Sequence, residues 1–153
     1  MKGLSLKHWN RLKKKMYSEI LSRTRTVDEL RELEHEIDIV AKSEYKADGG
    51  LAHVLNTSVR NFVAQNILAG SQSIGIDPYL QGLRSALSEL EPLQITLAFE
   101  PTDAIITRFY DWVLNNVSGG IVLDIIYDPW IIAGVKVVYK GKYGDYSIAS
   151  NVE

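Results

Sequence analysis

The fold is decided by residues 93–103, which read LQITLAFEPTD. The first seven residues alternate between apolar and other side chains, and a period of two predicts a strand with one apolar face. That face would carry Leu93, Ile95, Leu97 and Phe99. The next residues, Pro101-Thr102-Asp103, are typical of a helix start, because Thr and Asp can cap free backbone amides. The chain therefore changes here from one kind of periodicity to another.

Upstream of this stretch, apolar residues recur every three or four positions, which predicts amphipathic helices. We expect about four: Leu6 to Ile20, Thr26 to Asp48-Gly49-Gly50, Leu51 to near Gly70, and Asp77 to Pro92, with a turn at residues 71–75. Thr26-Val27-Asp28-Glu29 has the spacing of a capping box, in which Thr26 and Glu29 each bond the other's backbone amide.

Downstream of the stretch, one more helix should run from Thr102 to Ser118-Gly119-Gly120, and strands should follow it. The expected strands are residues 121–127, 133–139 and 143–148, separated by turns at Asp128-Pro129 and Lys140-Gly141-Lys142. The fold class predicted is therefore α+β. A helical bundle domain of about four helices would span residues 1–91, and a small β-α-β-β(-β) domain would span residues 92–153.

The composition is that of an ordinary globular protein. Hydrophobic residues make up 46% and charged residues 24% of the 153 residues, which argues against disorder. The absence of cysteine excludes disulfides and thiolate chemistry from this sequence. No run of 18 apolar residues occurs, and no secretory signal is expected at the start.

Charge is distributed unevenly along the chain. Residues 1–25 hold eight Lys and Arg against one acid, whereas residues 26–50 hold eight acids against three basic residues. The basic opening could bind nucleic acid or anionic lipid, contact an acidic protein, or form a solvated helix face beside the acidic segment. The last interpretation is favoured, since adjacent blocks of opposite charge attract each other.

No motif for catalysis, a cofactor or a metal stands out. His8, His35 and His53 lie in three separate predicted helices, without the spacing of a helical metal pair. Gly141-Lys142-Tyr143-Gly144 lacks the residue order of a phosphate-binding loop, and no nucleophile elbow occurs. We therefore predict no catalytic, cofactor-binding or metal-binding residue, and a binding subunit is favoured over an enzyme.

The C-terminal third resembles a known family. Residues 125–138 read IIYDPWIIAGVKVV, and KGK at 140–142 and DYS at 145–147 follow. Strand, Asp-Pro, short apolar stretch, strand, turn and Asp-x-Ser in this order resemble the delta subunit of F-type ATP synthases, called the oligomycin-sensitivity-conferring protein in mitochondria. The order of elements agrees over residues 77–148, about half of the chain.

Six motif residues are interpreted as structural: Asp128, Pro129, Gly134, Gly141, Asp145 and Ser147. The chain also departs from the family pattern. Ala133 stands where the family has the first glycine of a pair, the last short helix is short or missing, and about four helices stand in place of a six-helix bundle. The last of these departures, the reduced bundle, concerns the family's partner contacts in that domain.

The resemblance implies a non-catalytic stator subunit that takes part in ATP synthesis and proton transport only as a member of a complex. Its helical domain would grip the N-terminal segment of an alpha-type subunit of the catalytic head, and its C-terminal domain would meet the b-type stalk. It would lie peripherally on the cytoplasmic face of an energy-transducing membrane, or on the matrix face in an organelle.

Partner contacts are predicted at two places. The apolar stripe of the first helix offers Leu6, Trp9, Leu12 and Met16 as groove residues. Trp130 beside a turn would suit a protein contact if it is exposed and would be core if it is buried. The alternative function is a nucleic-acid-binding adaptor that uses the basic first helix, and a third is a small enzyme of another type.

Overall fold

The computed structural model describes the chain except for residues 1–10, 12–13, 44–48, 118–119, 132–133 and 146–153. It contains both helices and a sheet, so the predicted mixture of α and β elements is confirmed. The chain divides into two compact units. Unit 1 comprises Met1–Thr24 and Arg31–Glu89, and unit 2 comprises Arg25–Leu30 and Leu90–Glu153.

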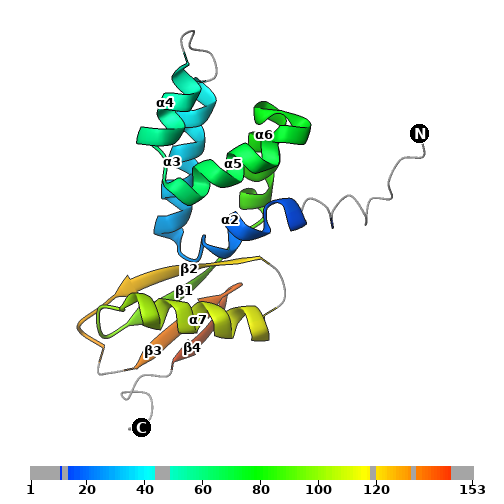
Figure 1. Cartoon of the computed structure of the whole chain (residues 1–153). Coiled ribbons are helices and arrows are strands. Elements are labelled where there is room, and N and C mark those ends of the chain that lie inside the picture. The colour runs from blue at the N-terminus through cyan, green and yellow to red at the C-terminus, as the bar shows by residue number, and fades with distance from the viewer. Residues whose placement is uncertain (1–10, 12–13, 44–48, 118–119, 132–133, 146–153) are drawn as a thin grey trace. The chain divides into compact units, whose positions relative to one another are not determined.

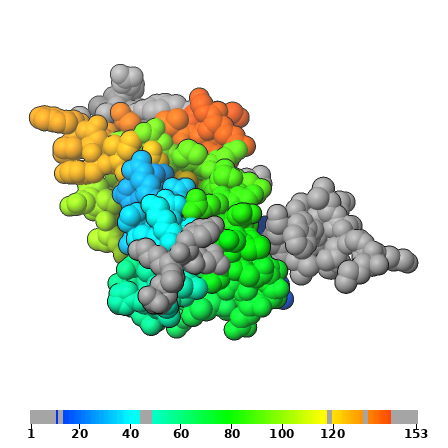
Figure 2. Space-filling view, turned by 90° about the horizontal axis from the view of Figure 1, so that it is seen from above, coloured from blue at the N-terminus to red at the C-terminus, as the bar shows by residue number. Residues whose placement is uncertain are grey.

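Unit 1 is helical (Figure 1). The helices are α2 (Ser18–Ser22), α3 (Val27–Ser43, whose first turn belongs to unit 2), α4 (Gly50–Thr57), α5 (Asn61–Ile74) and α6 (Ile76–Ser88). Each helix buries apolar residues at helical spacing, such as Leu33, Ile37 and Val40 of α3. In the space-filling view, the side chains of α4, α5 and α6, turquoise to green, form one continuous surface (Figure 2).

The capping box is confirmed. The backbone N–H of Glu29 donates to Thr26 Oγ1 at 3.2 Å, and the N–H of Thr26 donates to Glu29 Oε2 at 3.3 Å. Two amides that the helix leaves free are thus satisfied reciprocally, which fixes the start of α3.

The prediction of one helix from Leu51 to Gly70 is wrong, because α4 ends at Thr57 and α5 begins at Asn61. Arg60 takes an extended backbone, with φ −57° and ψ 142°, and its N–H donates to Glu36 Oε1 at 2.8 Å. Its guanidinium also pairs with the Glu36 carboxylate at 2.9 Å. Glu36 is only 5% exposed, so its carboxylate needs hydrogen-bond donors. Arg60 supplies them from an extended backbone conformation, and this interrupts the helix.

The predicted turn at residues 71–75 is also wrong for most of its length, since α5 continues to Ile74. Gly75 alone makes the break, with a φ of 89° that other residues rarely adopt. It is the N-cap of α6, so Asp77 lies in the first turn of that helix and does not cap it. The expected stop at Pro92 is shifted as well, since α6 ends at Ser88.

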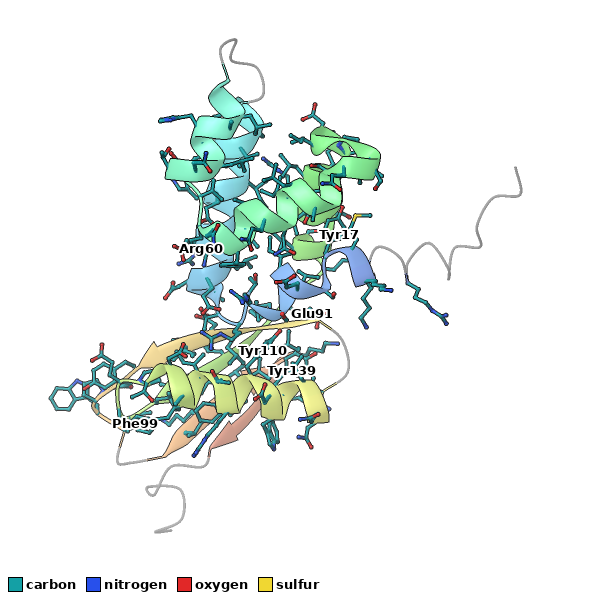
Figure 3. All side chains as sticks on the ribbon, viewed as in Figure 1. Tyr17, Arg60, Glu91, Phe99, Tyr110 and Tyr139 are labelled. Atoms are coloured by element: carbon teal, nitrogen blue, oxygen red, sulfur yellow. The ribbon has the colours of Figure 1, made fainter. Side chains whose placement is uncertain are left out.

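Two tyrosines fill the interior of unit 1, and two glycines make room for them. Tyr17 and Tyr79 have ring centroids 5.1 Å apart, and the Tyr17 hydroxyl donates to the carbonyl of Tyr79 at 3.0 Å. A Cβ at Gly70 would collide with the Tyr79 ring, and one at Gly82 would collide with the Tyr17 hydroxyl. Tyr17, which is labelled in Figure 3, interrupts the first predicted helix with a turn before α2.

Unit 2 is a four-stranded sheet with one helix across a face (Figure 1). Its elements are β1 (Glu91–Leu97), α7 (Asp103–Asn116), β2 (Ile121–Tyr127), β3 (Val135–Tyr139) and β4 (Lys142–Asp145). The strand order is β2-β1-β3-β4, with β1 parallel to β2, and β3 antiparallel to both β1 and β4. The α7 helix makes the crossover that a parallel pair requires.

The decisive stretch folds largely as its period predicts. Leu93, Ile95 and Leu97 are buried against α7, whereas Phe99 lies beyond the strand and is 43% exposed. Thr102 caps α7 by accepting the N–H of Ile105 at 3.4 Å. The turn between β3 and β4 has positive φ at both central residues, Lys140 and Gly141, as a two-residue hairpin needs.

Residues 25–30 are bound to unit 2 by Arg25. Its guanidinium pairs with Glu29 at 2.7 Å and with Asp103 at 2.8 Å, and donates to Thr107 at 2.8 Å. The carbonyl of Arg25 accepts the N–H of Leu123 at 2.8 Å, which adds a short segment to the edge of β2. Hydrogen bonds to the Glu29 and Asp103 carboxylates raise the pKa of Arg25 above its ordinary value, so the cation is fixed.

Candidate partner-binding surfaces

Four of the six motif residues, Asp128, Pro129, Gly134 and Gly141, lie in or beside turns of unit 2. Gly134, just before β3, has φ 112° and Gly141 has φ 75°, both in the region that favours glycine. Asp145 is the last residue of β4, and Ser147 lies outside the described residues. The glycines thus have conformational reasons for their positions, in keeping with a structural interpretation.

Asp128 organises the turn that follows β2. Its side-chain Oδ1 accepts the N–H of Trp130 at 2.9 Å, and its own N–H donates to the carbonyl of Leu97 at 2.9 Å. The N–H of Ile131 donates to the Asp128 carbonyl at 3.3 Å, and Ile131 itself is buried. Such an Asx turn holds the backbone between two fixed points, the end of β1 and Ile131.

Trp130 projects from this turn into solvent. Its side chain is 90% exposed, so Trp130 is not a core residue of unit 2, and the predicted protein contact stays a prediction. A fixed backbone with a large exposed aromatic side chain is the arrangement found at binding hot spots, because little order has to be added on binding.

The residues predicted to bind a partner in the first helix are described only in part. Leu6, Trp9 and Leu12 lie outside the described residues. Met16 is half-buried in a helical segment just before Tyr17. These four residues therefore stay a prediction.

An apolar groove runs between α7 and β3, and we name it the α7–β3 groove. It has a volume of about 670 Å³. It is lined by Leu93, Ile95, Phe99, Ile105, Arg108, Phe109, Trp112, Val113, Val135 and Val137. Arg108 is the only charged residue of this lining, and Trp112 is 59% exposed. Phe99, one of the lining residues, is labelled in Figure 3.

The groove was missed because the apolar residues of the expected helix after Thr102 were not divided between a buried and an exposed face. Tyr110 and Val113 are indeed buried, but Ile105, Phe109 and Trp112 follow a second line at helical spacing. An apolar face wider than one stripe was the signal, since a helix that packs on one face of a sheet needs only one buried stripe.

A second, more polar hollow of about 320 Å³ lies elsewhere in unit 2. It is lined by Thr26, Val27, Asp28, Glu100, Pro101, Ile106, Leu123, Asp124, Ile125 and Tyr127. In the described part of the chain, no group of three His, Asp or Glu is arranged to hold a metal ion. The carboxylates here line a surface hollow, and nothing in their geometry singles out a nucleophile or a general acid.

Glu91 fastens the hairpin to β1. Its carboxylate accepts the Tyr139 hydroxyl at 3.3 Å and pairs with the Lys140 ammonium at 3.3 Å (Figure 3). The pKa of Lys140 is raised by its hydrogen bond to Glu91, although the group is exposed. These contacts link the first residue of β1 to the end of β3.

Comparison with protein-family models gives no match for this chain, and comparison with curated proteins gives none either. Among the described residues, no helix combines the length and the apolar character needed to cross a bilayer.

Proposed function

We propose that the chain is a non-catalytic scaffold subunit of the peripheral stalk of an F-type ATP synthase, related to the delta subunit family. In this role the protein holds the catalytic head against the torque of the rotor, so that rotation is coupled to ATP synthesis. The work is mechanical, and it requires affinity and stiffness from the subunit without bond-making chemistry.

The observation that carries the proposal is the Asp128 turn with its exposed Trp130. The family resemblance rests on the residues around this turn, where the Asp128 side chain accepts the N–H of Trp130 and the Trp130 side chain is exposed. The succession β1-α7-β2-β3-β4 also follows the order of elements on which the resemblance was based. An aromatic side chain held in solvent beside a hydrogen-bonded turn suits binding more than catalysis.

The partners in this proposal are the N-terminal segment of an alpha-type head subunit and the end of a b-type stalk. Contact with the membrane would be indirect, through the complex, on the cytoplasmic or matrix face. Five exposed large apolar side chains of unit 2 besides Trp130 provide further contact area: Phe99, Trp112, Leu114, Ile126 and Tyr127.

Affinity purification tests the proposal. The tagged protein is isolated from detergent-solubilised membranes, and co-purifying chains are quantified by mass spectrometry. We expect alpha-type, beta-type and b-type subunits in fixed ratio, and we expect Trp130→Ala to reduce their recovery. Recovery of nucleic acid in a salt-sensitive manner would instead favour the adaptor that uses the basic first helix.

A further inference from the structure

The sheet of unit 2 is covered by a helix over only part of one face. Neighbouring strands lie about 4.8 Å apart and a helix with its side chains is about 10 Å wide, so a helix covers roughly two strands. In unit 2, α7 contacts β2, and the core residues Tyr110 and Val113 pack with residues of β1 and β2. Two of the four strands, β3 and β4, therefore lack a helical cover among the described residues.

The uncovered strip next to α7 is apolar. Val135 and Val137 of β3 point to the same side as the core but are only partly buried. On α7, Ile105, Phe109 and Trp112 line the same groove from the other side. Side chains of this kind are stabilised by burial at about 25 cal/mol per Å² of apolar surface, so a helix seated in the groove would gain free energy.

One charge distinguishes this groove from a simple apolar strip. Arg108 lies on its rim, and no hydrogen bond or ion pair engages it within the described part of the chain. By contrast, the guanidinium of the nearby Arg25 forms ion pairs with both Glu29 and Asp103. An unpaired guanidinium beside apolar side chains is complementary to a carboxylate at the edge of an apolar stripe.

We infer that the α7–β3 groove docks an amphipathic helix of a partner chain, and that a Glu or Asp beside the apolar stripe of that helix pairs with Arg108. The inference deepens the scaffold role and rests on it, because a stalk subunit must hold an elongated partner. Apolar anchors every three or four residues of such a helix would fill the apolar lining of the groove.

Residues 146–153 are a weaker candidate for the occupant. They read YSIASNVE, in which only Ile148 and Val152 are large aliphatic residues at helical spacing. This stretch therefore offers few of the apolar anchors that the groove would hold, and a partner helix with a full apolar stripe is favoured.

Site-specific photo-crosslinking in the intact complex tests this. A benzophenone amino acid is introduced at Trp112 in the groove, and in a matched control at Leu114, which is 52% exposed on the same helix but does not line the groove. We expect Trp112 to crosslink to a helical segment of another chain with an acidic residue within one turn, and Leu114 to crosslink at least fivefold less.

Arg108→Glu should lower the Trp112 crosslink roughly three- to tenfold, Arg108→Lys should largely retain it, and Asp111→Asn should leave it unchanged.

The inference is overturned if Trp112 crosslinks to residues 146–153, to a second copy of this chain, or no more than Leu114 does. If stalk and head subunits co-purify but Trp112 captures none of them, the groove inference fails and the proposed function stands. If Trp112 captures an acidic amphipathic helix from a complex without those subunits, the docking chemistry stands and the proposed function fails.

Discussion

The two units differ in what they do with large apolar side chains. Eight large hydrophobic residues are exposed in the described chain, and six of them belong to unit 2, although unit 1 contains more residues. The two in unit 1 are Leu68 and Ile74. Unit 1 closes its interior with fully buried aromatic and aliphatic residues, whereas unit 2 leaves a groove and a tryptophan in solvent. The difference indicates that unit 2 has the surface with most to gain from a partner.

The largest loss of stability should come from a side chain placed at Gly70, where the Tyr79 ring leaves no room for one. Gly70→Ala adds a methyl group against the ring of Tyr79, which is fully buried and cannot move aside. The gain in helix propensity is only about 1 kcal/mol, whereas overpacking costs about 1–3 kcal/mol or more. We expect a net loss of about 2 kcal/mol in the free energy of unfolding, measured by denaturant titration.

The matched control for this substitution is Gln72→Ala, at an exposed position of the same helix. It should change stability by less than about 0.5 kcal/mol. Gly82→Ala, which meets the Tyr17 hydroxyl, should behave like Gly70→Ala. If Gly70→Ala were more stable than the unchanged protein, the interior of unit 1 would have room for a methyl group beside Tyr79, and the expectation would be wrong.

The Glu36–Arg60 pair should come next. Glu36→Ala removes a carboxylate that accepts both the backbone N–H and the guanidinium of Arg60 (labelled in Figure 3). Because the Arg60 side chain is 31% exposed, water compensates in part, and we expect a loss of about 1–2 kcal/mol. The control is Asp38→Ala, which breaks the exposed ion pair with Arg84 and should lower the free energy of unfolding by less than about 0.5 kcal/mol.

Removal of the Tyr17 hydroxyl and removal of the Tyr79 hydroxyl should have different effects on the free energy of unfolding. The Tyr17 hydroxyl donates a hydrogen bond, so Tyr17→Phe should cost about 1 kcal/mol. The Tyr79 hydroxyl is buried without a hydrogen-bond partner among the described residues, so Tyr79→Phe should be neutral or stabilising. Thermal melts of the two variants under the same conditions decide this, and equal losses would contradict the assignment.

The Tyr79 hydroxyl should also make the free energy of unfolding depend on pH in the alkaline range. Burial raises the pKa of Tyr79 from about 10 to about 12. The unfolded chain releases this proton at lower pH than the folded one, so the contribution is fully present below pH 10 and is lost as the pH rises through 12. Tyr79→Phe should flatten this part of the profile of unfolding free energy against pH, whereas a profile that does not change would contradict the shift.

The smallest effects on stability should come from the exposed tryptophans of unit 2. Trp130→Ala should change the free energy of unfolding by less than about 0.5 kcal/mol, because 90% of the side chain is already in water. Asp128→Ala should cost more, about 1 kcal/mol, since it removes the acceptor for the Trp130 N–H. If Trp130→Ala destabilised the fold as much as Asp128→Ala, Trp130 would be a core residue and the comparison would fail.

Local patterns were sufficient for much of unit 2. The strand at residues 121–127, the alternation of Leu93, Ile95 and Leu97, and the hairpin at Lys140-Gly141 follow from period and turn chemistry. The capping box of α3 was equally readable, because both of its partners lie within one helical turn. Each of these features depends on residues that are close in the sequence.

The break between α4 and α5 could not be predicted, because its cause lies 24 positions away in Glu36. The same holds for the two glycines that admit the tyrosines, which look like weak helix positions until the opposing rings are seen. Local propensity was overruled in both places by the need to pair a buried charge or to fill an interior.

The sequence alone determined the mixture of helix and strand, the start of α3 and the turns at Asp128-Pro129 and Lys140-Gly141, since these depend on hydrogen bonds and periodicity within a few residues. Only the tertiary structure decided that Trp130 is exposed and that Trp112 lines an open groove. The fate of an apolar side chain depends on which other elements reach it, and α7 covers only part of the sheet. Exposure is a property of the assembled layers, so the candidate binding surface can be recognised only in the folded unit.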